Sequence, residues 1–166
     1  MPVSSSVDLL FLRHGIAEAR IDGLDHPDRA LTDRGRLRTR AVVHQLRRLG
    51  VEADVLVSSP YRRALETAQE AIKAGLAPSL HLDEALAPGG DLWSLLPGLS
   101  GSCLLVGHEP ALGGLASALI GAPPRSLRLR KAGFCHVRWC AELQDPRGMA
   151  ELQALLRPRL LFPRSV

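Results

Sequence analysis

The chain has 166 residues, 46% of them hydrophobic and 23% charged, and it carries a formal net charge of +4. These values are typical of one globular domain spanning 1–166 and exclude a disordered chain. No apolar run reaches the ~18 residues that cross a bilayer. The N-terminus lacks a convincing signal peptide, so we expect a cytoplasmic protein that binds no membrane. Aromatic residues make up only 4% of the chain, which disfavours base stacking and hence a nucleic-acid partner. The positive charge is compatible with an acidic protein partner or a phosphorylated substrate.

The first predicted strand ends in residues that can bind a ligand. An apolar run from Leu9 to Leu12 predicts a buried strand, and it stops at Arg13, His14 and Gly15. In α/β proteins, sites form beyond the carboxyl ends of such strands. The histidine can present a ring nitrogen to a substrate, and the guanidinium can bind phosphate oxygens. The glycine lets a ligand approach the backbone closely.

A polar loop over 16–30 is predicted next, because this segment is rich in Gly, Pro and Asp. Thr32 is then expected to cap a helix that ends near Gly50. Apolar residues at helical spacing predict the buried face of this helix: Leu37, Ala41, Val42, Leu46 and Leu49. We expect its arginines to be solvated, and a docking patch for an acidic partner is the alternative.

The second predicted strand, 53–57, also ends in a polar turn. Ser59 is expected to cap a helix over 61–74. Arg62 and Arg63 then lie in the opening turn of that helix, where backbone N–H groups favour anions. One of them could be a second phosphate-binding arginine, and two solvated arginines are the alternative.

A short strand over 78–82 is predicted to lead into a loop over 83–91 and a brief helix over 92–96. The loop carries carboxylates that could each act as a general acid, namely Asp83, Glu84 and Asp91.

The fourth predicted strand, 102–106, leads into a turn that contains His108, and a helix is expected over 110–120. A strand over 133–140 is predicted to pair with 150–157 as a hairpin, with a helix as the alternative for the last segment. Three cysteines without CxxC spacing are expected to be buried thiols rather than a disulfide framework or a zinc site: Cys103, Cys135 and Cys140.

Three strand-to-helix turns therefore supply Arg13 with His14, Arg62 with Arg63, and His108. In a parallel sheet these turns lie at one edge, so their side chains can converge. Two guanidinium groups and a second imidazole around one neutral imidazole suit phosphoryl transfer, in which charge spreads over three oxygens. A divalent metal is not expected, because the arginines would repel it and no acidic ligand cluster is present.

Four segments resemble the signature segments of the histidine phosphatase superfamily, which is also called phosphoglycerate mutase-like. They are 12–15 (LRHG), 31–35 (LTDRG), 58–68 (SSPYRRALETA) and 106–110 (VGHEP). The resemblance extends from about Leu9 to Leu119. It implies an α/β fold, a three-layer α/β/α sandwich with a mostly parallel central sheet.

The resemblance also implies roles for single residues. His14 corresponds to the nucleophile that becomes phosphorylated, and Arg13, Arg63 and His108 correspond to its phosphate pocket, together with Gly15. Arg63 is favoured over Arg62 because the arginine of the family directly precedes an alanine. Glu84 is the nearest positional match to the proton-donating carboxylate of the mutase-like branch. No cofactor and no metal are implied.

The short length and the GHEP turn resemble the SixA-type phosphohistidine phosphatases, which act on phosphohistidine in proteins, including phosphotransfer domains of bacterial signalling. We therefore predict a monomeric, metal-independent phosphatase whose partner is a phosphorylated protein. A broad phosphatase of small phosphate esters and a catalytically decayed binding protein for phosphorylated ligands are the alternatives. A mutase is disfavoured, because the chain leaves too little length for an enclosing lid.

Overall fold

The computed structural model of the chain describes residues 6–140 and 145–162. A six-stranded sheet has the order β3-β2-β4-β1-β5-β6. Its strands are β1 (Ser6–Arg13), β2 (Val55–Ser58), β3 (Leu80–Leu82), β4 (Ser102–Gly107), β5 (Phe134–Cys140) and β6 (Glu151–Leu156). The strands β3, β2, β4 and β1 pair in parallel, whereas β5 and β6 are antiparallel to their neighbours. The predicted mostly parallel sheet is confirmed.

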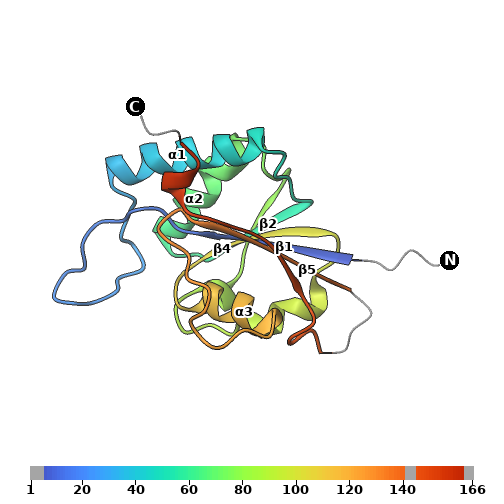
Figure 1. The fold of residues 1–166 in the computed structure, drawn as a ribbon. Coiled ribbons are helices and arrows are strands. Elements are labelled where there is room, and N and C mark those ends of the chain that lie inside the picture. Colours follow the sequence, from blue (N-terminus) through green and yellow to red (C-terminus); the bar gives the residue numbers. More distant parts are fainter. Residues whose placement is uncertain (1–5, 141–144, 163–166) are drawn as a thin grey trace.

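Helices cover both faces of this sheet (Figure 1). The helices α1 (Asp33–Arg48) and α2 (Arg62–Lys73) pack on one face, and α3 (Ala111–Leu119) packs on the other. Two 3₁₀ helices, η1 (Glu84–Leu86) and η2 (Leu92–Gly98), join α3 on its side. A third, η3 (Pro158–Leu160), follows β6. The predicted three-layer sandwich is therefore confirmed.

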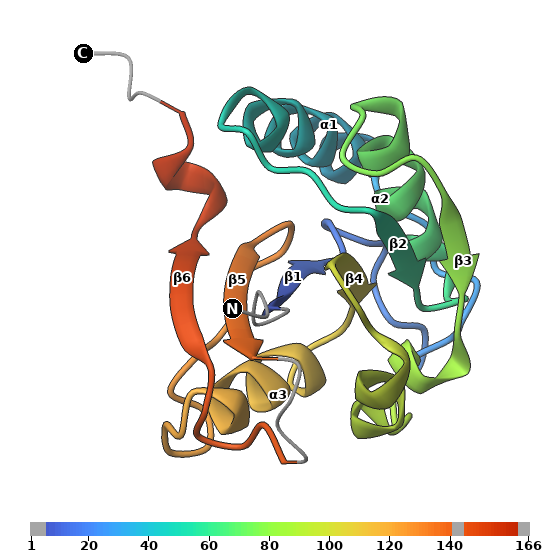
Figure 2. The same ribbon diagram turned by 90° about the vertical axis from the view of Figure 1, so that its right-hand side faces the viewer.

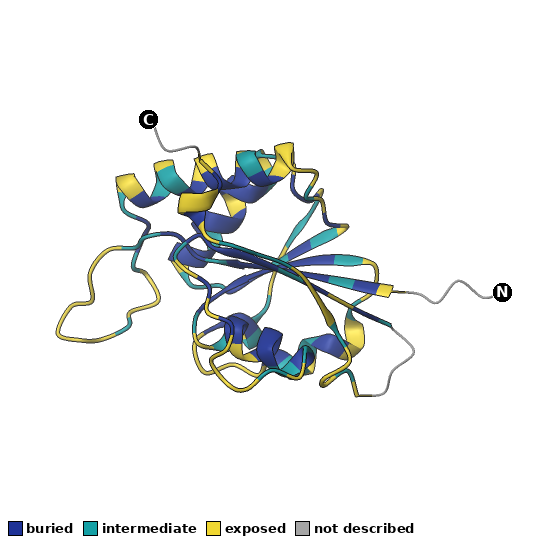
Figure 3. Ribbon diagram, in the orientation of Figure 1, coloured by how far each residue is buried: buried dark blue, intermediate teal, exposed yellow. Residues whose placement is uncertain are grey.

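The central strand β1 shows why the sheet is buried on both faces (Figure 3). Leu9 and Phe11 lie in the apolar cluster on the α3 side, while Leu10 and Leu12 lie in the cluster beneath α1 and α2. Side chains alternate between the faces of a strand, so a continuous apolar run is what a strand with two covered faces requires. This burial fixes the level at which β1 ends, and thereby the position of the residues that follow it.

The helix α1 begins after Thr32, whose hydroxyl accepts a hydrogen bond from Gly35 N, as predicted. Its predicted buried face is partly wrong. Leu37 and Leu49 are 65% and 57% exposed. Of the predicted face, Val42 and Leu46 are buried as expected. The other residues that pack inward are Gly35, Thr39 and Val43.

Two further expectations change. The helix α2 begins at Arg62 with Tyr61 as its N-cap, so Ser59 does not cap it. The hydroxyl of Ser59 instead accepts a hydrogen bond from Tyr61 N at 3.2 Å and contacts a histidine ring described below. Cys103 and Cys135 are buried thiols as expected, whereas Cys140 is only half-buried.

The segment after β5 resolves the alternative left by the sequence. The strand β6 pairs antiparallel with β5, so the predicted hairpin is confirmed and the helical alternative is wrong (Figure 2). The loop over 16–30 contains only two isolated bridges, Ala17 to Leu31 and Ile21 to Leu24. Within the described ranges, none of the helices is both long and apolar enough to span a membrane.

Candidate active site

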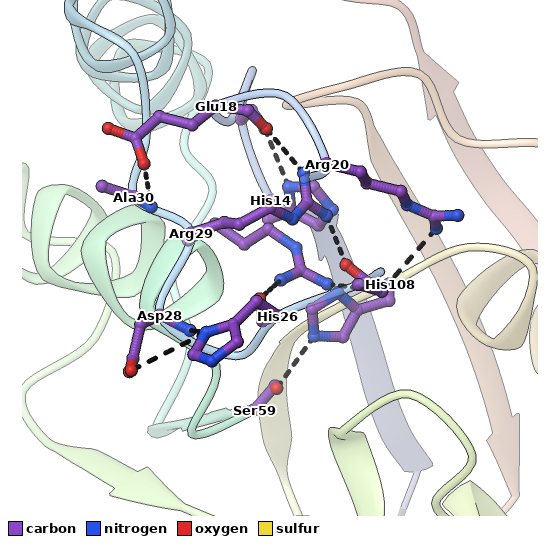
Figure 4. A network of polar contacts seen from close by, with 12 residues as sticks. His14, Glu18, Arg20, His26, Asp28, Arg29, Ala30, Ser59 and His108 are labelled. Carbon is purple, nitrogen blue, oxygen red and sulfur yellow. Dashed lines mark hydrogen bonds and ion pairs between the residues drawn. The ribbon is translucent and has the colours of Figure 1, made fainter. Parts of the chain in front are cut away.

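The predicted convergence of the three turns is present. Arg13 pairs in register with Gly107, so β1 and β4 end side by side. Beyond these ends, His14 N donates to Gly107 O at 3.0 Å, and Ser59 N donates to Val106 O at 2.9 Å. These backbone bonds hold the turns after β1, β2 and β4 at one level. As a result, the ring centroids of His14 and His108 lie 5.0 Å apart (Figure 4).

His14 is held as a neutral imidazole with a defined tautomer. Its Nδ1 lies 2.8 Å from Gly15 O. A carbonyl oxygen can only accept, so Nδ1 carries the proton and Nε2 keeps its lone pair. Burial, with the positive charge of Lys131, lowers the pKa of His14 to about 2. The ring is 3% exposed. At neutral pH, Nε2 is therefore an unprotonated nucleophile.

His108 is the second buried imidazole. Its Nε2 contacts Ser59 Oγ at 2.8 Å, and its Nδ1 is buried with no hydrogen-bond partner in the described structure. Burial and the positive charge of Arg63 lower the pKa of His108 to about 3. When Ser59 donates to Nε2, Nδ1 carries the proton and becomes an unsatisfied donor. Such a donor has a strong preference for an incoming anion.

Arg63 lies in the first turn of α2 and is only 1% exposed. Its Nη2 donates to Asp25 Oδ2 at 3.0 Å, its Nη1 donates to His26 O at 3.4 Å, and its guanidinium lies 5.0 Å from the Tyr61 ring centroid. Arg62 is exposed instead. The sequence left either arginine possible, and the structure places only Arg63 beside the two histidines.

Arg13 approaches from the end of β1. Its Nη1 donates to Leu129 O at 2.9 Å. Glu109 accepts a hydrogen bond from Leu129 N at 3.3 Å and from Gly113 N at 3.0 Å, so it fixes the segment that binds Arg13.

Unsatisfied donors are concentrated at this site. Five buried side-chain polar atoms in the described residues lack a hydrogen-bond partner, and four of them belong here: Arg13 Nε, Arg29 Nε, Arg63 Nε and His108 Nδ1. Buried polar groups are normally hydrogen-bonded, so such a cluster indicates a site for an absent acceptor. Three guanidinium groups and an imidazole are suited to a tetrahedral oxyanion such as phosphate.

The comparisons with known proteins agree with this geometry. The sequence pattern of the histidine phosphatase superfamily (branch 1) matches residues 9–87. An uncharacterised protein of Picosynechococcus sp. is 36% identical over 165 residues, which cover 95% of this chain and 100% of that protein. The chain belongs to the histidine phosphatase superfamily.

Solved structures share the fold of this histidine phosphatase. The protein histidine phosphatase SixA complexed with tungstate has a TM-score of 0.79 at 23% identity, covering 93% of this chain and 99% of that one. A phosphoserine phosphatase of Entamoeba histolytica, in complex with 3-phosphoglyceric acid, has a TM-score of 0.65 at 18% identity, covering 94% and 100%. The matched sequence pattern includes His14 and Arg63 but ends before His108, which is placed by the structure.

The loop over 16–30 adds two residues to the site of this histidine phosphatase that the sequence did not single out. Asp25 forms ion pairs with Arg63 and Arg29, and Arg29 Nη1 also donates to Glu18 O at 2.6 Å. Arg20 also forms an ion pair with Asp25 at 3.7 Å, and Figure 4 shows Arg29 and Arg20 within this network of polar contacts. Burial raises the pKa of Asp25, but the hydrogen bond from Arg29 and the nearby arginine charges outweigh it, so the net pKa is lowered. Asp25 is thus a carboxylate anion on the guanidinium of Arg63.

The turn that follows His14 is bonded to α2. Gly15 N donates to Thr67 Oγ1 at 3.0 Å, and that hydroxyl donates to Arg63 O at 2.7 Å. The turn at Gly15 is also tightly enclosed, because a Cβ there would lie 2.2 Å from Thr39 Oγ1. A glycine is needed at this position for close approach rather than for backbone conformation.

Glu84, the predicted proton donor, is exposed at the start of η1. Its carboxylate makes no hydrogen bond or ion pair with another described residue, and only its backbone carbonyl is bonded, to Ala87 N at 2.9 Å. Its role as an acid stays a prediction.

Proposed function

We propose that this histidine phosphatase hydrolyses phosphohistidine on a protein, without a metal, through a phosphorylated His14. The observation that carries the proposal is a neutral imidazole with a free Nε2 beside a cluster of unsatisfied buried donors. A neutral imidazole without these donors would not bind a phosphoryl group. The donors without a free imidazole nitrogen would bind phosphate but not cleave its ester or amide.

In the first step, His14 Nε2 attacks the phosphorus atom. The new P–Nε2 bond forms as the P–N bond to the substrate imidazole breaks, and the leaving ring takes the electron pair of that bond. Arg13 and Arg63 bind the equatorial oxygens, and His108 donates to one of them as charge builds. The proton stays on His14 Nδ1, where Gly15 O accepts its hydrogen bond, and the positive charge of the phosphorylated ring is delocalised over both nitrogens.

In the second step, water attacks the phosphorus atom of phosphorylated His14. The P–Nε2 bond breaks, its electron pair returns to Nε2, and inorganic phosphate leaves with the water oxygen. One proton passes to the solution. The neutral state of His14 favoured by burial is then restored.

The nature of the leaving group explains why a strong acid is not required. A protonated phosphohistidine ring leaves as a neutral imidazole, whereas an alkyl phosphate ester must leave as an alkoxide unless it receives a proton. Asp25 cannot supply that proton readily, because its net pKa is lowered. The exposed position of Glu84 is consistent with a substrate that does not depend on it. A Glu84→Gln variant is therefore expected to keep its turnover of phosphohistidine, and loss of turnover with binding intact would contradict this reasoning.

The deciding experiment measures phosphate release from a phosphohistidine-bearing phosphotransfer domain in the presence of EDTA. The native chain should release phosphate, and His14→Ala should not. His44→Ala is the matched control, because His44 is an exposed histidine on α1. Peptide mapping after rapid acid-free quenching should locate phosphate on His14. Release unchanged in His14→Ala would refute the assignment of the nucleophile.

A phosphatase of small phosphate esters is the second candidate. The phosphoserine phosphatase of similar fold was solved with 3-phosphoglyceric acid, so the fold accommodates a small phosphorylated acid in that protein. Turnover of sugar phosphates with none of phosphohistidine would favour this candidate. If phosphate binds but His14 never becomes phosphorylated, the chain is a binding protein.

A further inference from the structure

A strongly basic groove opens next to the nucleophile. It has a volume of about 320 Å³, and Ile16, two residues after His14, forms part of its wall. Five of its seven lining residues are cationic and none is acidic: Arg38, Arg130, Lys131, Arg157 and Arg159. The groove lies outside the set of residues to which the two catalytic steps assign a role.

The fold brings these cations together from three separate parts of the chain. Arg38 lies on α1, Arg130 and Lys131 precede β5, and Arg157 and Arg159 lie around the start of η3. Figure 1 shows the C-terminal turn beside α1. Leu161, which follows η3, packs in the same apolar cluster as residues of α1, so the groove has a fixed wall.

The groove cations differ from several other arginines of α1 in their ion pairing. Other arginines of α1 are paired, since Arg36 contacts Glu66 and Arg40 contacts Glu70. In contrast, none of the five groove cations forms an ion pair with any residue in the described ranges. Clustered like charges repel one another, so an external anion in the groove would relieve that repulsion.

Lys131 links the groove to the catalytic histidine. Its neighbour Ala132 donates a backbone hydrogen bond to His14 O at 3.1 Å. The charge of Lys131 also contributes to the lowered pKa of His14. Burial and the charges of Arg13 and Arg63 lower the pKa of Lys131 itself to about 8, which leaves it mostly charged at pH 7. An anionic surface in the groove would therefore lie next to a phosphoryl group bound at His14.

The geometry points to the groove as a docking site for an acidic surface of the protein that carries the phosphohistidine. This inference rests on the proposed function and adds the kind of partner. A small anion requires convergent, desolvated donors, but Arg130, Arg157 and Arg159 are exposed and come from different segments. Spread, solvated charges act instead through complementarity with an extended surface, and they accelerate and orient encounter.

The test measures KM and kcat for two substrates with the native chain, a groove variant and a control variant. The first substrate is a phosphohistidine-bearing phosphotransfer domain with an acidic surface, and the second is free phosphohistidine. In the groove variant, Arg157→Glu with Arg159→Glu, KM for the protein should rise by about tenfold at low ionic strength. Its kcat, and both constants for free phosphohistidine, should stay within about twofold of the native values.

A charge-matched control separates local docking from net charge. Arg34→Glu with Arg48→Glu removes the same charge from exposed, unpaired arginines of α1 that do not line the groove. Its KM for the protein should stay close to that of the native chain. Added NaCl should raise KM for the protein substrate in the native chain more than in the groove variant.

Three results would overturn the docking site: an unchanged KM for the protein in the groove variant, an equal rise in the control variant, or an equal rise for free phosphohistidine. In each case phosphate is still released, so the proposed function stands. If the native chain hydrolyses neither phosphohistidine substrate, the proposed function and the docking site both fall.

Discussion

Lowering the pH from 7.0 to 5.5 should destabilise the phosphate-free protein through its two buried histidines. In the folded chain the pKa values of His14 and His108 are about 2 and about 3. In the unfolded chain a histidine has a pKa near ~6.5. Between these values the unfolded state binds more protons, so stability is fully present above about pH 6.5 and is lost as the pH falls toward 3. Each histidine should cost about 1.3 kcal/mol between pH 7.0 and 5.5, or about 2.5 kcal/mol for both.

The assay is urea unfolding at the two pH values in buffers that contain no phosphate. A His14→Gln, His108→Gln double variant should lose about 2.5 kcal/mol less than the native chain over this interval. His44→Gln should behave like the native chain, because His44 is exposed on α1. Equal losses in the native chain and the double variant would refute the conclusion that both rings are neutral in the folded state.

Three other substitutions or treatments have defined outcomes. Gly15→Ala places a Cβ 2.2 Å from Thr39 Oγ1. The substitution should therefore lower the free energy of unfolding in urea by about 1–3 kcal/mol and also lower kcat. A native-like kcat would show that the turn can relax. Asp25→Asn removes an anion from Arg63, so inorganic phosphate should bind several-fold more tightly by calorimetry, and weaker binding would show that Asp25 orients the guanidinium instead. Burial raises the pKa of Cys135 to about 12, so iodoacetamide should alkylate it only after unfolding, as followed by mass spectrometry.

The sequence predicted those parts of the site that follow a strand directly. The apolar run before Arg13 fixes the end of β1, and the same is true of β4 before His108, because each strand is buried on both faces. The end of such an apolar run therefore fixes the point at which the strand leaves the core. The positions of His14 and His108 are therefore set by local sequence together with parallel pairing.

The remaining site residues depend on tertiary contacts that leave no local pattern. Asp25 and Arg29 lie in a loop without helix or strand, and only the fold of that loop brings them to Arg63. The backbone bond from Ala132 N to His14 O brings the neighbouring Lys131 close to His14 across more than a hundred residues. The misplaced face of α1 has a similar cause, since Thr39 is buried beside Gly15 while the apolar Leu37 is exposed. Hydropathy alone predicts that Leu37 is buried and Thr39 is exposed.

The hydroxyl of Thr67 joins the turn that carries His14 to the helix that carries Arg63. These two residues are thus held by one side chain, and the loop over 16–30 contacts the same unit through Asp25 and His26. A loop of different length or charge would therefore change the anion receptor together with the access to it, because Asp25 pairs with Arg63 and Arg29 supplies one of the unsatisfied donors. A segment grafted in its place would have to retain both positions.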